Sequence, residues 1–457
     1  MTRSSVYAPL LLASLAPSAR GQSPDDVLAR YVLDGKPAAV TRTDVALEMA
    51  FHLRRRDRGQ EAIALLVDAT LTRRAAEQKG LMPTRPEVEQ FWHTLQDQLR
   101  AAGQNPASFA AVRNTNPDQW LADLAVQMAQ ERLVRAELGL GKEEAVGPDM
   151  LKLWLQEQRR LRRVVVDQDA LPLGACAQVD DTTLPLADLG LLLLRTAEDA
   201  ERERFVRQVV YLQAIEALGR ARGVQVGEAD LEASIAARRA EAARDPRYAG
   251  ATFEQLLQGQ GMTVAALREL RVFRAQVLLD KLALVLWPDA DLQAELRRDR
   301  QTVLDLVGPR RHLGVIFVRA LVDPNDLVPR DFAAATAHLQ QVRERLDRET
   351  FANVAAIESE DNATKPRGGD TGWHRRKSGQ LPEPVLAAAF ALPAGEVSAP
   401  VRSEEGVWLV KVLEVDPDPS DVRLVEQLRR YKALELQQQV LRDAQIELVT
   451  APPAGPK

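Results

Sequence analysis

A glycine-rich segment in the last third of the chain limits the possible folds more than any other stretch. It reads Arg-Gly-Gly-Asp-Thr-Gly-Trp at residues 367–373. Glycine adopts positive φ at little cost, whereas most side chains disfavour this conformation. The segment therefore predicts tight turns at fixed places in the backbone.

A short helix and a buried strand are predicted directly after this segment. The apolar residues 385–390 follow two prolines, which suit the first turn of a helix, and Pro393 with Gly395 ends that helix. Residues 406–412 are almost continuously apolar. Such a run is typical of a strand that is buried on both faces.

Three further elements are predicted before the segment. Residues 311–318 form an apolar strand that carries His312 near its start. Apolar residues spaced three and four apart predict an amphipathic helix over 332–346. The Ser-Glu-Asp sequence at 359–361 predicts a turn.

This order of parts resembles the parvulin-type (PpiC-like) peptidyl-prolyl cis-trans isomerase domain. That family has a strand with an early histidine, an amphipathic helix, a Ser-x-Asp turn, Gly-Gly-Asp-x-Gly-aromatic, an apolar helix ending in Phe and a last strand. The resemblance covers about residues 310–415. It implies an antiparallel sheet with flanking helices, and an activity that rotates X-Pro bonds without a cofactor.

The resemblance also implies a set of site residues. His312 and Asp361 are the implied catalytic residues, which would tune the polarity of the site. The implied substrate-binding residues are Asn362, Leu381, Val385, Phe390 and Trp408. Two interpretations stay open for the catalytic pair: His312 is either catalytic or a structural histidine of the sheet, and Asp361 is either catalytic or the cap of its turn.

The chain departs from the family at three positions. Trp408 stands where a second histidine usually pairs with the first across the sheet, Val385 replaces the aromatic floor of the proline pocket, and Arg402 replaces a further aromatic. Two functions are therefore compatible with the domain. It is either an isomerase or a parvulin-fold chaperone, catalytically weak or inactive, that only binds peptides.

The rest of the chain has a helical composition in which one order of signals occurs twice. Apolar spacing predicts a helix over about 60–79 that Gly80 ends, and a second over 205–222 that Gly223 ends. A new helix start follows each glycine. We predict two copies of one helical module.

A helical module before a parvulin domain looks like the chaperone region of the SurA and PrsA families. In SurA-like proteins a last helix returns to this region, and residues 420–444 supply such a helix. Ile446 and Leu448 then alternate as in a strand. The simplest members of these families have one such module, so the predicted duplication is a difference from them.

The predicted fold class is therefore α+β, with a mainly helical chaperone region of two modules and a small parvulin-like domain. The predicted boundaries are a signal peptide at 1–21, helical modules at 22–160 and 161–306, a parvulin-like domain at 307–417, a C-terminal helix packing back on the helical region at 418–450 and a disordered tail at 451–457.

The first residues resemble an export signal. Arg3 precedes an apolar run over 6–16, and Ala19 to Gly21 fits cleavage between small residues. The alternative is an N-terminal tail with a chance leucine cluster. The run is short for a bilayer span, and we expect no integral membrane span after signal cleavage. The predicted location is periplasmic or secreted, in a bacterial envelope.

Other classes of function are disfavoured by composition and spacing. The net charge is −5 with Lys and Arg spread among Asp and Glu, so no nucleic-acid partner is expected. Cys176 is the single cysteine, which rules out an intrachain disulfide. The five histidines are scattered, so we predict no metal site and no cofactor.

We therefore expect an exported folding factor. It would bind unfolded or proline-containing exported polypeptides in apolar clefts and catalyse cis-trans isomerisation of X-Pro bonds. The alternatives are the binding-only chaperone described above, which is not an enzyme, and an interaction scaffold for an envelope complex.

Overall fold

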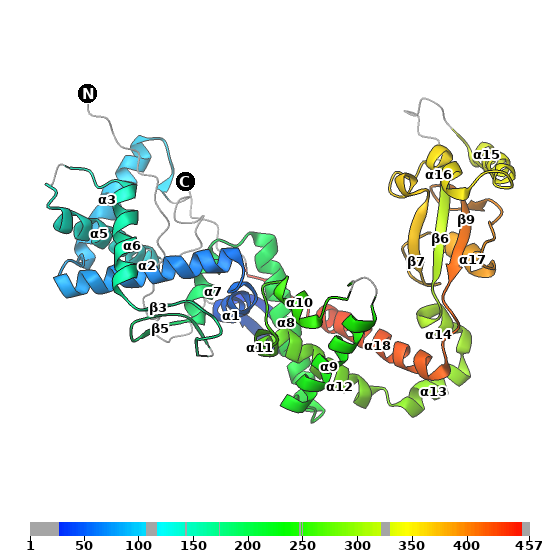
Figure 1. Ribbon diagram of the computed structural model, residues 1–457, viewed down its shortest axis with the longest axis horizontal. Coiled ribbons are helices and arrows are strands. Elements are labelled where there is room, and N and C mark those ends of the chain that lie inside the picture. Colours follow the sequence, from blue (N-terminus) through cyan, green and yellow to red (C-terminus); the bar gives the residue numbers. More distant parts are fainter. Residues whose placement is uncertain are drawn as a thin grey trace. The chain divides into compact units, whose positions relative to one another are not determined.

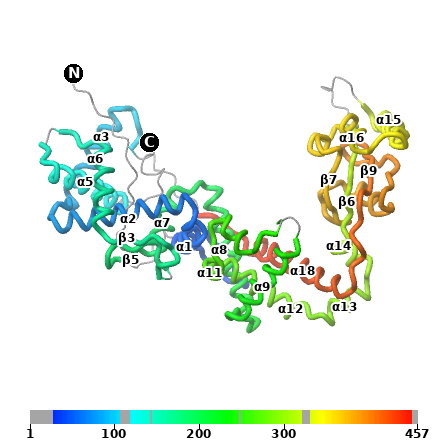
Figure 2. The backbone as a smooth tube through the Cα atoms, in the orientation of Figure 1, coloured from blue at the N-terminus to red at the C-terminus, as the bar shows by residue number. Residues whose placement is uncertain are grey.

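The computed structural model describes residues 27–449 except 107–116, 142–143, 173, 246–247, 249 and 321–329. The predicted signal peptide at 1–21 and the predicted tail at 451–457 lie outside the described residues. The chain divides into a first unit, residues 1–279 with 437–457, and a second unit, residues 280–436. Figures 1 and 2 show the elements of both units.

The first unit repeats one order of elements. Its first repeat contains β1 (Val27–Leu33), β2 (Lys36–Thr41), α1 (Arg42–Leu53), α2 (Asp57–Lys79), α3 (Arg85–Ala101), α5 (Pro117–Leu138), α6 (Pro148–Leu161) and β3 (Val164–Val165). Its second repeat contains β4 (Ala175–Val179), β5 (Thr182–Pro185), α7 (Leu186–Arg195), α8 (Asp199–Ala221), α9 (Glu228–Arg244), α10 (Phe253–Gln258), α11 (Val264–Glu269) and α12 (Arg271–Leu286). In both, a hairpin leads into a short helix and then a helix of 23 residues.

The helix ends follow the sequence closely. Gly80 and Gly223, each with φ of +66°, lie just after α2 and the end of α8, as predicted. Glycine permits this left-handed conformation, in which the last free carbonyl groups of a helix are satisfied. At the start of α1, the Thr41 hydroxyl accepts the Asp44 N–H, and the Asp44 carboxylate accepts the Thr41 N–H, which forms a capping box.

The predicted helical module at 22–160 also contains a hairpin near its start, formed by β1 and β2, which the sequence pattern did not indicate. Asp34 and Gly35, both with positive φ, make the turn, and an Asp-Gly pair is a recognised hairpin signal. A second hairpin, β4–β5, contains Cys176 in its first strand. Both hairpins were missed because the helical spacing around them dominated the pattern.

The third strand of each sheet comes from outside the repeat that supplies the hairpin. Strand β3 ends the first repeat, yet it pairs with β4 of the second. Strand β10 (Glu447–Leu448), near the end of the chain, pairs with β1 of the first repeat, which confirms the strand predicted there. Each three-stranded sheet is therefore completed by a segment from another part of the chain.

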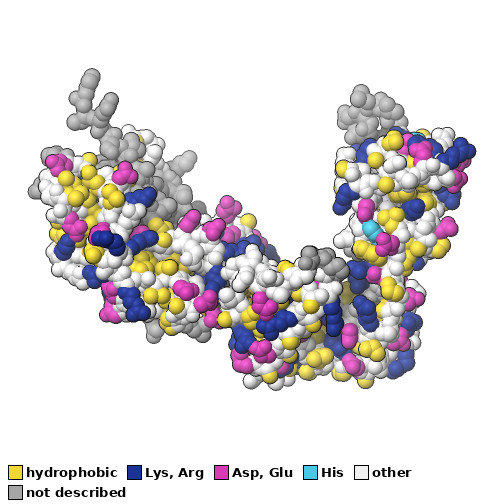
Figure 3. Space-filling model, viewed as in Figure 1, with side chains coloured by type: hydrophobic (Ala, Val, Ile, Leu, Met, Phe, Trp, Pro, Cys, Tyr) yellow, Lys and Arg dark blue, Asp and Glu magenta, His cyan; other side chains and the backbone are white. Residues whose placement is uncertain are grey.

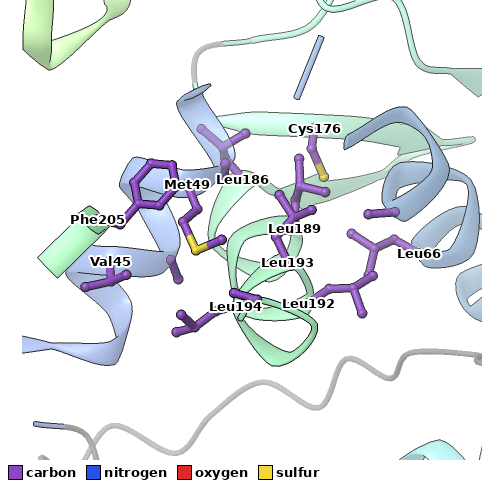
Figure 4. Packing of buried hydrophobic residues seen from close by; sticks show 14 of the residues in the cluster. Val45, Met49, Leu66, Cys176, Leu186, Leu189, Leu192, Leu193, Leu194 and Phe205 are labelled. Carbon is purple, nitrogen blue, oxygen red and sulfur yellow. The ribbon is translucent and has the colours of Figure 1, made fainter. Parts of the chain in front are cut away.

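One hydrophobic core joins the two repeats (Figure 4). Val45 and Met49 of α1 pack with Leu189 and Leu193 of α7, and Phe205 of α8 lies against them. The contact is close because Gly190 has no side chain: a Cβ there would lie 1.9 Å from the Ala46 carbonyl oxygen. Cys176 is buried in the same core, where burial raises its pKa to about 12 and leaves it an unreactive thiol.

The second unit contains an antiparallel four-stranded sheet of order β7-β6-β9-β8. Its strands are β6 (Arg311–Arg319), β7 (Asp370–His374), β8 (Val401–Arg402) and β9 (Gly406–Val415). Its helices are α13 (Asp289–Arg298), α14 (Arg300–Val307), α15 (Phe332–Arg345), α16 (Phe351–Glu358), the short 3₁₀ helix η3 (Lys365–Arg367), α17 (Glu383–Ala391) and most of α18 (Asp421–Asp443). The predicted α+β class is confirmed.

Helices cover both faces of this sheet. Residues from α15 and α16 pack with Ile316, Val318 and Leu409 on one face. Val385, Leu386 and Ala389 of α17 pack on the other. The central strands β6 and β9 are therefore buried on both faces, as their apolar runs predicted.

Acidic and basic side chains are interspersed on the face of the molecule drawn in Figure 3. Among the described residues, no helix combines the length and apolarity needed to cross a bilayer. Within the same residues, no group of three or more His, Cys, Asp and Glu side chains is placed to hold a metal ion.

The crossing of α1 and α7 can be tested with Gly190→Ala. The added methyl group must push α1 away from α7, so we expect the free energy of unfolding of the first unit to fall by roughly 1–3 kcal/mol despite alanine's better helix propensity. Gly141→Ala is the matched control, because a Cβ there meets nothing within 4 Å. Urea unfolding followed by circular dichroism makes the comparison, and equal stability of the two variants would contradict the close crossing.

Candidate functional site

The glycine-rich segment packs its backbone directly against the sheet. Gly368, Gly369 and Gly372 have φ of +65°, +82° and +82°, which confirms the predicted tight turns. A Cβ at Gly369 would lie 2.3 Å from the Val315 carbonyl oxygen, and the Val315 N–H donates to the Gly369 carbonyl at 2.8 Å. Only glycine allows β7 to begin this close to β6.

A cavity of about 1190 Å³ opens beside this segment. Phe332, Leu381 and Trp408 contribute apolar surface to its lining. The charged and polar lining residues include Asp361, Arg367, Thr371, His374, Arg402, Ser403, Glu404 and Glu405. The cavity therefore combines an apolar surface with many charged and polar groups, and a concave site of this kind can bind a short peptide segment.

An aromatic pair lies on the central strands beside the cavity. Phe317 of β6 is directly opposite Trp408 of β9, and their ring centroids are 4.4 Å apart. The indole Nε1–H of Trp408 donates to the Ser403 hydroxyl at 2.9 Å. Because its one polar group is satisfied in this way, Trp408 presents an apolar ring to the cavity.

His312 lies elsewhere on the sheet. It is opposite Glu414 on β9 and Trp373 on β7, and its Nε2 is 2.7 Å from Asp370 Oδ1. Its ring stacks on Trp373 with centroids 5.3 Å apart. The expectation that His312 faces Trp408 is therefore wrong, because the register of β6 and β9 places Phe317 at that position.

Asp361 lies in the cavity lining and also caps its own turn. Its Oδ1 accepts the Ala363 N–H at 3.1 Å, and its Oδ2 accepts the Thr364 hydroxyl. The structure thus shows Asp361 as the cap of its turn, and a catalytic role for Asp361 stays a prediction.

The predicted substrate-binding residues divide into two groups. Leu381 and Trp408 line the cavity together with Asp361. Val385 is fully buried against the sheet, and Phe390 packs beside the same core with the Arg311 guanidinium 5.0 Å from its ring centroid. Asn362 is exposed. Asn362, Val385 and Phe390 are all absent from the described lining of the cavity.

His374 is a lining residue that the sequence reasoning missed. It is 3% exposed, and its Nε2 lies 2.9 Å from the Thr371 hydroxyl oxygen. That hydroxyl is placed to donate its proton to the Leu313 carbonyl at 2.8 Å, so the His374 Nε2–H acts as the donor to Thr371. The one signal in the sequence was its position directly after the glycine-rich segment.

Comparison with known proteins decides what this domain is. Residues 320–414 match the family model described as Rotamase: PPIC-type PPIASE domain. The second unit carries a PpiC-type isomerase domain. Most of the first unit, residues 1–279, precedes this domain, which supports the SurA- and PrsA-like order of a helical region before an isomerase domain.

The curated proteins that this chain is similar to include chaperones and foldases. Chaperone SurA of Hahella chejuensis is 27% identical over 200 residues, which cover 42% of this chain and 43% of that protein. Foldase protein PrsA of Clostridium kluyveri is 37% identical over 81 residues, which cover 18% of this chain and 24% of that protein. These matches span less than half the length of either relative.

Among solved structures, the PrsA peptidylprolyl isomerase of Bacillus anthracis is 17% identical to this chain. The match covers 52% of this chain and 93% of the PrsA chain, with a TM-score of 0.25.

The burial of His374 makes the stability of the PpiC-type domain depend on pH. Burial lowers the pKa of His374 from its usual 6.5, while the hydrogen bond to the Thr371 backbone opposes this, as Asp370 also does. Its Nδ1 is shielded and has no hydrogen-bond partner among the residues that the structure describes, so a second proton would be unsatisfied there. We conclude that His374 is neutral at pH 7.

The sign of the effect follows from proton linkage. Because the folded pKa lies below 6.5, the folded state binds fewer protons than the unfolded state, and stability is lost as pH falls below about 6.5. We expect the free energy of unfolding of the second unit, measured with urea, to fall more between pH 8 and pH 5 in the wild type than in His374→Gln. Equal losses in the two proteins would contradict the assignment.

Proposed function

We propose that this protein is an extracytoplasmic folding factor that binds unfolded, proline-containing polypeptides and catalyses isomerisation of their X-Pro bonds. The observation that carries the proposal is the cavity of the PpiC-type domain, where Leu381, Phe332 and Trp408 surround space for a prolyl ring. The similarity to SurA and PrsA supports a polypeptide as the substrate.

The reaction needs an environment that favours a twisted amide. Rotation about an X-Pro bond must overcome amide resonance, a barrier of about 18–20 kcal/mol, and each 1.4 kcal/mol or so removed raises the rate about tenfold. The planar amide is the more polar state and is stabilised by water. An apolar surface that excludes water therefore favours the twisted state, and the Trp408, Leu381 and Phe332 side chains provide such a surface within the otherwise polar lining.

One observation favours binding without turnover as the second candidate. Trp408 stands where the family usually has its second histidine, and the residue opposite it on β6 is Phe317, not His312. His374 and Thr371 supply polar groups to the cavity instead. We propose that the aromatic pair and these polar groups replace the histidine pair in the isomerase.

The isomerase proposal is tested with the full-length protein and an Ala-Pro peptide by exchange NMR. We expect acceleration of cis-trans exchange, and a loss of roughly tenfold or more in Trp408→Ala, which removes the apolar ring. His312→Ala is the control and should keep the activity, because His312 is not among the described lining residues. Peptide binding without acceleration would establish the binding-only chaperone.

Chaperone action is proposed for the helical first unit. Leu153 and Leu161 of α6 are 65% and 63% exposed, and Phe91 of α3 is also exposed. Exposed apolar side chains of this size can hold apolar segments of an unfolded chain.

We expect the protein to suppress aggregation of an unfolded model protein at near-equimolar ratio. The double variant Leu153→Gln, Leu161→Gln should suppress aggregation less, because it removes apolar surface without disturbing the core. Val422→Gln is the matched control, since Val422 is 69% exposed but lies in the second unit. No suppression by the wild type would favour the envelope scaffold, and light scattering makes the measurement.

An envelope location follows from the similarity to SurA and PrsA. We propose the periplasm or secretion as the destination, supported by the export-signal pattern of residues 1–21. Cell fractionation and N-terminal sequencing of the mature protein test this assignment.

A further inference from the structure

A second, smaller cavity lies in the second unit, away from the residues assigned to isomerisation. Its volume is about 390 Å³. It is lined by the chain before β6, the residue after β7, the segment 416–420 and the first two turns of α18. Three arginines, Arg310, Arg375 and Arg423, contribute to this lining.

One of the three arginines already has a carboxylate partner. Arg310 Nε donates to Asp416 Oδ2 at 2.8 Å, and the Arg310 backbone N–H donates to the same oxygen at 3.2 Å. The Arg310 guanidinium also lies 5.2 Å from the centroid of the Trp373 ring. Asp416 is therefore the ion-pair partner of Arg310.

The other two arginines have no such partner. Within the described part of the chain, neither Arg375 nor Arg423 makes a side-chain hydrogen bond or an ion pair. Arg375 is half-buried, and its Nε is fully shielded without a partner. Burial and then the Arg310 charge lower the pKa of Arg375, and Asp416 only partly opposes them.

A half-buried cation beside a second cation is unfavourable unless an anion compensates both. The start of α18, a helix of 23 residues, adds to the attraction. The helix dipole favours negative charge at this end, although the Ser420 hydroxyl already accepts the Arg423 N–H and Asp421 of the first turn pairs with Arg300. Asp418 also lines the cavity, and its carboxylate repels an anion. The charged residues of the described lining are therefore three arginines and two aspartates.

We propose that this cavity binds a small oxyanion, either phosphate or carboxylate, between Arg375 and Arg423. Guanidinium groups match the geometry of both anions through paired N–H donors. The occupant would join the end of β7, and so the sheet of the PpiC-type domain, to the first turn of α18. The anion thereby fixes how firmly the domain is held on that helix.

Two sources can supply the anion. One is free inorganic phosphate, and the other is an acidic side chain of a bound polypeptide. Both present an oxyanion to Arg375 and Arg423, so the experiment must use probes that distinguish the two sources.

The test is an NMR titration of the full-length protein with sodium phosphate at constant ionic strength, with sodium chloride as the balancing salt. We expect saturable shifts of amides near Arg375 and Arg423. Arg375→Gln and Arg423→Gln should each weaken phosphate binding at least tenfold, and because Arg423 is exposed, its variant should fold normally. Arg402→Gln, an exposed arginine of the isomerase cavity, is the matched control and should bind as the wild type does.

A second arm uses an Asp-containing tripeptide with blocked ends and its Asn counterpart. Displacement of phosphate by the Asp peptide alone assigns the site to acidic side chains, and no displacement assigns it to the free anion. The proposal is overturned if sodium chloride produces the same shifts, or if the Arg375 and Arg423 variants bind phosphate as tightly as the wild type. The NMR titration does not depend on isomerase activity, so its result is independent of whether the proposed function is correct.

Discussion

The register between β6 and β9 is the constraint on which the PpiC-type domain depends. Side chains alternate between the two faces of a strand, so a shift of one residue would exchange every side chain of β6 between the two cores. In the observed register Phe317 meets Trp408, and His312 meets Glu414. The register therefore places Phe317 behind Trp408, which lines the isomerase cavity, and places His312 opposite Glu414, outside the described lining.

The end of β7 connects the two cavities of the second unit. His374 is the last residue of the strand and lines the isomerase cavity, whereas Arg375 follows it and lines the cavity at α18. Successive residues of an extended chain point in opposite directions, which explains how neighbours can serve two sites. A bound anion at Arg375 would therefore act one residue away from the buried histidine of the isomerase cavity.

The first unit depends on a comparable close contact. Gly190 lets α7 approach the backbone of α1, and the shared core and the pairing of β3 with β4 then join the two repeats. Strand β10 comes after the whole PpiC-type domain in the chain, yet it completes the sheet of the first repeat. Folding of the first unit therefore requires residues from both ends of the sequence.

The sequence alone determined the local features: the turns at Gly368 and Gly369, the helix stops at Gly80 and Gly223, and the buried strand β9. These depend on backbone conformation and apolar spacing within a few residues. It also indicated the PpiC-type domain and placed Asp361, Leu381 and Trp408 in its cavity. Only the tertiary structure decided that Phe317 replaces His312 opposite Trp408, that Val385 and Phe390 pack in the core, and that His374 is buried. Register and burial arise from contacts between distant segments, which local patterns do not specify.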